Sequence, residues 1–330
     1  MSLLNVTSPH AHGQLSTAKV MQLVVLATLP GIAALVGVFG AGVLINLVIA
    51  AVASLACEAA ILSLRGRPVS FYLQDFSALV TAVLLAISLP PYAPWWVVVI
   101  GAVFAIGVAK QLYGGLGYNP FNPAMAAYVV LLISLPVQMT QWGAPFAAQP
   151  MGLAEAMASN ILQHVDAVTS ATPLDALKQG IDTLSGATGH IGGYGWEWVN
   201  AGFLLGGLFL MWRGIFSWHA PVSMLAALAA MAFLFPNDAL SRVDSILFHL
   251  FSGASMFGAF FIITDPVSSA TTHRGKLIFG GLIGALVYSI RHWGNYPDAV
   301  AFAVMLLNLA APFIDQYTQP RTFGHGGTPS

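Results

Sequence analysis

The sequence predicts an all-α polytopic membrane protein with about ten transmembrane helices, and three observations support this prediction. Of the 330 residues, 57% are hydrophobic and only 7% are charged, whereas soluble domains carry about 25% charged residues. Apolar runs of about 20 residues, the length of a helix that spans a bilayer, recur along the whole chain. The net charge of −1 gives no basic surface for nucleic acid. The lipid bilayer is therefore the expected environment of most of the surface.

The expected helices form two groups of five. Backbone groups in lipid must be hydrogen-bonded within their own segment, so each apolar run is expected to be a helix. The tail before the first run has no basic region ahead of an apolar core, and we therefore expect no cleaved signal peptide. Residues 1–139 hold the N-terminal tail and the first five helices, 140–196 form a long polar loop, and 197–330 hold the other five helices and the C-terminal tail. In chain order, the apolar runs are 20–39, 41–64, 74–90, 94–113, 122–139, 197–213, 217–236, 244–264, 276–294 and 298–315.

The distribution of Lys and Arg predicts how the chain lies in the membrane, because basic residues favour the cytoplasmic side. With a cytoplasmic N-terminus, eight of the 11 basic residues lie on that side and three on the other. Both termini are then cytoplasmic, and the loop of residues 140–196 is periplasmic in a bacterial inner membrane. The eight are Lys19, Arg65, Arg67, Lys110, Arg213, Arg274, Lys276 and Arg321, and the three are Lys178, Arg242 and Arg291.

Two pairs of stretches resemble each other across the chain. "FSALVTAVLLAISLPP" at 76–91 resembles "FSGASMFGAFFIITDP" at 251–266, and 107–130 matches 284–307 in its pattern. From position 76 to position 251 the offset is 175 residues and five helices. Because five is odd, the two halves must point in opposite directions, and such inverted repeats place binding sites at broken segments. Chance similarity between Leu-, Ala- and Gly-rich helices is the alternative.

The polar loop contains one specific motif, an Asp-x-x-Ser-Gly-Ala-Thr string that runs from Asp182 to Thr188. The small residues Ser185, Gly186 and Ala187 let the backbone turn tightly and let another molecule approach closely. A Thr hydroxyl at the end of such a turn is accessible to a modifying enzyme. An ordinary turn in a surface loop is the alternative.

This motif resembles the signal read by bacterial flavin transferases, which join FMN through its phosphate to the Thr hydroxyl. A ten-helix chain with that signal between its fifth and sixth helices resembles the NqrB/RnfD family of membrane subunits, and the resemblance covers essentially the whole chain. "NPFNPAM" at 119–125, "TDPVSS" at 264–269 and "YPDAVAFAVMLLN" at 296–308 are also similar to the family. The resemblance implies covalent FMN at Thr188, a flavin transferase for maturation, and the other membrane and peripheral subunits of an Rnf-type complex as partners.

The resemblance also implies a second flavin in the membrane part, a non-covalent riboflavin. Asn119 and Asn122 lie three residues apart before the fifth expected helix. Their amides can donate and accept hydrogen bonds, which suits the pyrimidine edge of a flavin. A capped helix start with Pro in its first turn explains the same residues without any ligand, so both interpretations stay open.

Ionisable residues fall inside or beside several apolar runs, where charge is costly. Glu58 and Asp75 lie toward the expected cytoplasmic ends of two helices in the same half, and they are the candidates for an ion pathway. They are expected either to bind a cation or to pair with Lys110, which we otherwise expect to extend toward the membrane surface. The spacing of His and Cys residues predicts no metal site.

Two classes of function fit these features. One is a flavin-carrying electron-transfer subunit of an Rnf-type ferredoxin:NAD oxidoreductase that moves Na⁺ or H⁺, with the Na⁺-pumping NADH:quinone oxidoreductase as the alternative complex. The other is a stand-alone transporter built on inverted repeats. The sequence contains no nucleotide-binding fingerprint and, with Cys57 as its single cysteine, no iron–sulfur ligand set. We therefore expect those sites on other subunits, and no complete enzyme in this chain.

Overall fold

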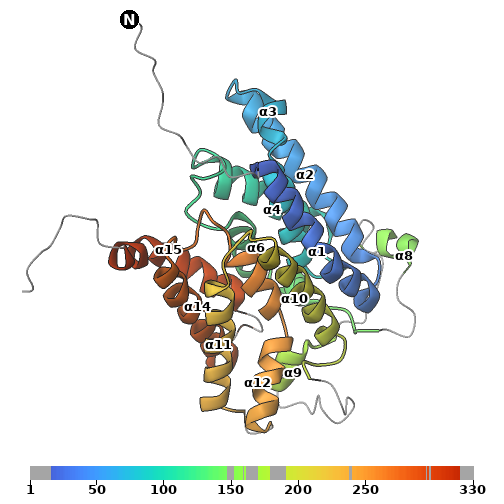
Figure 1. The fold of residues 1–330 in the computed structure, drawn as a ribbon. Coiled ribbons are helices and arrows are strands. Elements are labelled where there is room, and N and C mark those ends of the chain that lie inside the picture. Colours follow the sequence, from blue (N-terminus) through green and yellow to red (C-terminus); the bar gives the residue numbers. More distant parts are fainter. Residues whose placement is uncertain are drawn as a thin grey trace, which may run out of the picture.

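The computed structural model describes residues 16–146, 152–158, 160, 170–178, 191–237, 240–294, 296 and 299–319. The described part is built from helices and contains no β-strand. Its N-terminal half, drawn from blue to green, and its C-terminal half, drawn from yellow to red, lie against each other (Figure 1). The elements are α1 (Thr17–Phe39), α2 (Gly42–Leu64), α3 (Val69–Leu73), α4 (Ser77–Ser88), α5 (Trp95–Val103), the π-helix η1 (Phe104–Gln111), α6 (Pro123–Ser134), α7 (Pro136–Thr140), α8 (Leu153–Met157), α9 (Pro173–Lys178), α10 (Trp196–Trp212), α11 (His219–Leu234), α12 (Arg242–Phe251), α13 (Ser255–Phe257), the π-helix η3 (Gly258–Ile262), α14 (His273–Trp293) and α15 (Val300–Thr318).

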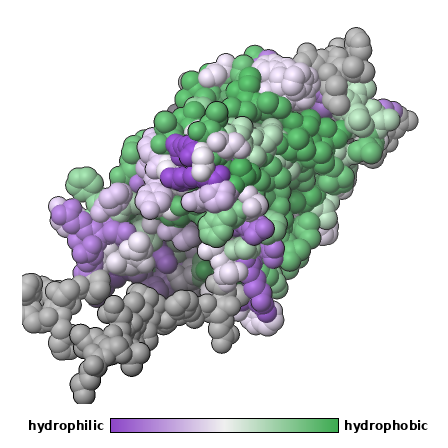
Figure 2. All heavy atoms as spheres, turned by 90° about the horizontal axis from the view of Figure 1, so that it is seen from above, coloured by the Kyte–Doolittle hydropathy of each residue, from purple (hydrophilic) through white to green (hydrophobic). Residues whose placement is uncertain are grey.

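Each apolar run expected from the sequence overlaps helical structure, so the all-α prediction is confirmed for the described residues. Within them, α1, α2 and α15 are long and apolar enough to cross a membrane. The pair formed by α12 and Ser255–Ile262 makes a fourth candidate span, bent by 63° at its break. Figure 2 shows hydrophobic side chains over most of one face, with hydrophilic groups in smaller patches. These features are those of a multi-pass membrane protein.

The start of α6 follows directly from the sequence. Asn122 is its N-cap, and the side-chain oxygen of Asn122 accepts hydrogen bonds from the backbone amides of Ala124 at 3.1 Å and Met125 at 3.2 Å. Pro123 occupies the first helical position, where its missing N–H costs nothing. The capping interpretation of Asn122 is therefore confirmed.

The helices pack against one another both within each half and between the halves. In the N-terminal half α2 packs against α4 and against α5 with η1, and in the C-terminal half α11 packs against α12 and α14. Between the halves, α1 packs against α10 and α6 against α15. The α1–α10 contact needs small residues, because a Cβ on Gly206 would lie 1.9 Å from the carbonyl oxygen of Ala27. The core therefore extends along the boundary between the halves.

Candidate functional site

A cavity of about 360 Å³ lies between the two halves, within the range of about 300–1,000 Å³ usual for small-molecule sites. Residues of α1, α4, η1, α6, α10, α11, η3 and α14 line it, together with the segments before α6, after α10 and after η3. The lining is mostly apolar and has a few polar groups, which is the usual composition of a ligand site. Its polar residues include Ser77, Thr81, Lys110, Asn119, Asn122, Thr264, Asp265 and Lys276.

The two predicted asparagines both line this cavity and are both buried. Asn119 donates from Nδ2 to the carbonyl of Phe121 at 2.9 Å, while its Oδ1 has no hydrogen-bond partner within the described residues. Asn122 caps α6 with its oxygen and lies 3.4 Å from a carboxylate oxygen of Asp265 with its Nδ2. Asn122 thus combines a capping contact with a place on the cavity wall, and Asn119 leaves one acceptor available.

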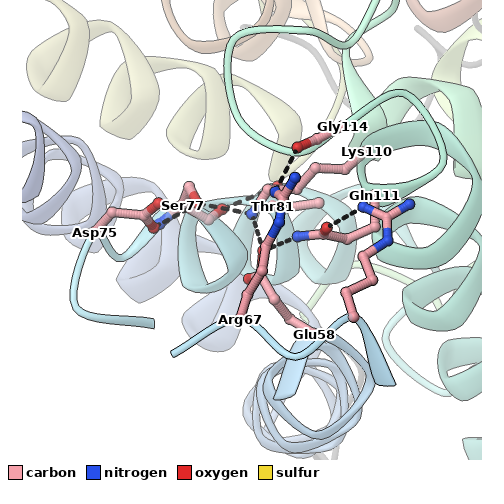
Figure 3. A network of polar contacts seen from close by, with 9 residues as sticks. Glu58, Arg67, Asp75, Ser77, Thr81, Lys110, Gln111 and Gly114 are labelled. Carbon is pink, nitrogen blue, oxygen red and sulfur yellow. Dashed lines mark hydrogen bonds and ion pairs between the residues drawn. The ribbon is translucent and has the colours of Figure 1, made fainter. Parts of the chain in front are cut away.

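Lys110 joins the cavity wall to a buried ion pair. Its Nζ lies 2.7 Å from Oε1 of Glu58, and both side chains are at most 3% exposed. The same Nζ donates to Oγ of Ser77 at 2.7 Å, and Nε2 of Gln111 donates to Oε1 of Glu58 at 2.7 Å (Figure 3). The pairing of Glu58 with Lys110, one of the two alternatives expected from the sequence, is confirmed. The expectation that Lys110 extends toward the membrane surface is wrong, because its ammonium group is buried and donates to Glu58 and Ser77 instead of to water.

The π-helical geometry of η1 explains how two consecutive residues reach one carboxylate. The amide of Leu112 bonds to the carbonyl of Gly107, five residues earlier, at 3.0 Å. This wider turn lets Lys110 and Gln111 both point at Glu58 (Figure 3), and such bulges are frequent at functional sites. Sequence reasoning missed Gln111, whose one signal is its place beside a lysine in an otherwise apolar run.

Asp75 holds the start of α4. Its Oδ1 accepts hydrogen bonds from the backbone N of Ser77 at 2.7 Å and from its hydroxyl at 2.5 Å. Between them Phe76 adopts a left-handed conformation with φ of 61°, which is strained for a residue with a side chain. Asp75 is thus linked to Lys110 through Ser77, a second polar residue that the sequence analysis missed.

A smaller cavity of about 90 Å³ lies at the opposite ends of the same helices. Both cavities are lined by α1, α4, α6, α10 and the helical segment from α13 to η3. Trp142 and Trp196 border the smaller one, with their ring centroids 5.1 Å apart. Asp175 of α9 also lines it, so the described stretches before and after residues 179–190 both border this cavity.

The flavinylation motif lies outside the described residues. This applies to each of its predicted members, which are Asp182, Ser185, Gly186, Ala187 and Thr188. Of the other predicted site residues, the structure brings Asn119 and Asn122 to one cavity, and it connects Glu58 and Asp75 to the same cavity through Lys110 and Ser77.

Comparison with known proteins gives a consistent result. The family model described as "NQR2, RnfD, RnfE family" matches residues 4–324. The chain belongs to this family. Proteins named as the D subunit of an ion-translocating oxidoreductase complex are similar to it over 98% of its length. They include those of Ectopseudomonas mendocina at 57% identity and 97% of that protein, Pseudomonas aeruginosa at 54% and 97%, and Cellvibrio japonicus at 52% and 96%.

Proposed function

We propose that this chain is the membrane-embedded, flavin-carrying electron-transfer subunit of an Rnf-type ion-translocating ferredoxin:NAD oxidoreductase complex. It carries FMN covalently on Thr188 and riboflavin non-covalently at Asn119 and Asn122, and electron transfer is coupled to movement of Na⁺ or H⁺. The ferredoxin, NAD and iron–sulfur sites belong to other subunits. Relatives named as the D subunit of an ion-translocating complex, at 52–57% identity over nearly the whole chain, favour the Rnf branch over the Nqr branch.

The two cavities at opposite ends of one set of helices are the main support for a relay between two flavins. α6 borders both, with Asn122 and Pro123 at the larger cavity and Met125 and Tyr128 at the smaller one. At 1.5 Å per residue, Asn122 and Tyr128 lie about 9 Å apart along the helix axis. Two cofactors bound there would be close neighbours across the interior of the protein.

The residues of the larger cavity fit riboflavin. Its volume of about 360 Å³ is sufficient for a small molecule, and the buried, unpartnered Oδ1 of Asn119 offers an acceptor to a ring N–H. The Nδ2 of Asn122 offers a donor on the same wall. When bound, the flavin ring supplies the redox chemistry. The residues of this chain bind and orient the ring, exclude water, and place the positive charge of Lys110 where it stabilises negative charge in the cavity.

The smaller cavity, at about 90 Å³, is too small to enclose a flavin ring, so its aromatic border is where the ring of FMN carried by the adjoining loop would rest. Aromatic rings such as Trp142 and Trp196 pack well against a flat ring system. The charged phosphate cannot be left in lipid, whereas a polar loop at the interface can hold it. Because the cofactor is attached covalently at Thr188, its position does not depend on a binding equilibrium.

The proposed arrangement in the membrane is ten helices in two inverted five-helix repeats. The matching helix partners of α2 and α11 support this arrangement. In a bacterial inner membrane both termini are cytoplasmic and the flavin-carrying loop is periplasmic, which places the larger cavity near the cytoplasmic side. Glu58 and Asp75 then belong to the ion pathway on that side.

An SDS gel of the complex, viewed under ultraviolet light, tests this function. The complex is purified from cells that also make a flavin transferase. We expect a fluorescent band at the mass of this chain that is lost in Thr188→Ala and kept in Thr183→Ala, the matched change in the same loop. Asn119→Ala is expected to keep the band and to lower acid-extractable riboflavin. A band that persists in Thr188→Ala overturns the acceptor assignment, and unchanged riboflavin in Asn119→Ala overturns the cavity assignment.

A further inference from the structure

A line of buried residues with polar side chains runs along one face of α2. Asn46, Ser54 and Glu58 lie on it at multiples of four residues, Ala50 fills the remaining place, and none of the four is more than 2% exposed. Residues four apart share a helix face. From Asn46 to Glu58 the helix rises about 18 Å, which is more than half of the roughly 30 Å hydrocarbon core of a bilayer. We call these residues the α2 polar line.

Two oxygen atoms on this line have no hydrogen-bond partner within the described residues, namely Oγ of Ser54 and Oε2 of Glu58. Helix hydroxyls can be satisfied locally, as Thr81 and Ser88 show by donating to the carbonyl one turn earlier, at 3.0 and 2.8 Å. The hydroxyl of Ser54, like that of Ser245 in α12, has no such partner within the described residues. Buried polar atoms are normally satisfied, and most strictly in lipid. Two unsatisfied oxygens one helical turn apart therefore point to a small ligand that accepts their lone pairs, such as a cation.

Further polar groups extend the line at both ends. Beyond Asn46, the side chain of Asn160 donates to Oδ1 of Asn46 at 3.1 Å and leaves its own Oδ1 unpartnered within the described residues. Beyond Glu58, the exposed Arg65 donates to Oε1 of Gln111 at 3.4 Å. The polar groups thus lie along α2 from its exposed end to the region around its other end, with Ala50 as the one apolar place within the α2 polar line.

The charge of Lys110 controls whether a cation can bind at Glu58. In this structure Lys110 neutralises Glu58, and a further positive charge beside a neutral pair in a medium of low dielectric constant is unfavourable. Lys110 also lines the larger cavity. A negative charge added in that cavity attracts the ammonium group toward it and leaves Glu58 to another cation.

We propose that the α2 polar line is the route of the translocated monovalent cation, with Ser54 and Glu58 as inner ligands and Lys110 as the competitor for Glu58. This inference rests on the proposed function, because it gives the coupled cation its route. It assigns roles to Asn46, Ser54 and Lys110. The ligand chemistry, oxygen atoms with one carboxylate, suits either Na⁺ or a proton carried as a hydrated ion.

The test uses the assembled complex in liposomes, with reduced ferredoxin and NAD as electron donor and acceptor. Uptake of radioactive sodium and of protons is measured per electron pair, against Na⁺ concentration and against pH. Ser54→Ala removes one neutral ligand, so we expect the half-saturating concentration of the transported ion to rise by about fivefold, with little change in the maximal rate. Ser63→Ala is the control, because it removes a hydroxyl from the exposed side of the same helix.

A second variant keeps the test decisive if a single substitution misfolds the protein. The double variant Glu58→Gln with Lys110→Met removes both charges and keeps the side-chain volumes similar, and we expect it to retain the covalent FMN on Thr188 and to lose ion uptake. A Na⁺ dependence at fixed pH identifies sodium as the ion, and a pH dependence without sodium identifies protons. If Ser54→Ala keeps the half-saturating ion concentration of the wild type, or if the double variant takes up ions as fully as the wild type, the proposed cation route along α2 is wrong. If instead the wild-type complex carries no flavin, the proposed function fails.

Discussion

The N-terminal half of the molecule buries a charged pair, whereas the C-terminal half buries a histidine whose ring has no hydrogen-bond partner within the described residues. Glu58 and Lys110 meet at 2.7 Å on the wall of the larger cavity. His249 is equally buried, and its ring packs edge-on against Tyr288 with centroids 4.9 Å apart. Arg291 bonds to the backbone carbonyl of His249 at 3.0 Å. The difference teaches that burial alone does not mark an ion site, because the Glu58–Lys110 pair lies at a cavity wall, whereas the ring of His249 packs against Tyr288.

Lys110→Met should have the largest effect on stability. It leaves Glu58 buried without its cation, and breaking a buried pair on one side costs about 3–5 kcal/mol. Thermal unfolding of the purified chain in detergent, with and without the change, measures the loss. Adding Glu58→Gln should recover most of it, since no unpaired charge then remains. A single variant as stable as the wild type would show that Glu58 does not depend on Lys110.

Ser77→Ala should have an intermediate effect. The hydroxyl of Ser77 accepts from Lys110 and donates to Asp75, so its removal leaves two charged groups short of a contact. A hydrogen bond to a charged group contributes about 1.5–3 kcal/mol. We expect a loss in that range from the buried Lys110 contact, because the partly buried Asp75 keeps its bond to the backbone N of Ser77. Ser88→Ala in the same helix is the matched control, because its hydroxyl bonds to a backbone carbonyl and to no charge. Equal losses in the two variants would contradict a special role for Ser77.

His249→Phe should have the smallest effect. Phe keeps an aromatic ring against Tyr288, and neither ring nitrogen of His249 has a partner within the described residues that the change would leave unsatisfied. Replacing an unsatisfied polar group by an apolar one of similar shape is nearly neutral, within about 1 kcal/mol. Denaturant unfolding in detergent measures the difference. A loss as large as that of Lys110→Met would remove the distinction between the two clusters.

The sequence predicted the helices well because the bilayer imposes one rule on every apolar run. It indicated the pairing of Glu58 with Lys110 as one of two alternatives, but it did not predict that the ammonium group of Lys110 is buried. It did not predict Gln111 or Ser77, because their roles depend on the π-helical turn of η1 and on the strained start of α4. Local backbone geometry of this kind leaves no clear pattern in composition or periodicity. The apolar run at 244–264 shows no sign of the break between α12 and α13, for the same reason.

The π-helical turn of η1 has a consequence for how this site can change in evolution. An i→i+5 turn holds one residue more than an α-helical turn, so chain length in this stretch decides which side chains face Glu58. Loss of a single residue between Phe104 and Gln111 would leave a regular, apolar membrane helix, yet it would rotate Lys110 away from its carboxylate. An insertion or deletion here would change which side chains contact Glu58, although the composition of the helix would stay almost the same. Relatives with a helix one residue shorter would therefore need a different cation for this acid, even where every remaining residue is identical.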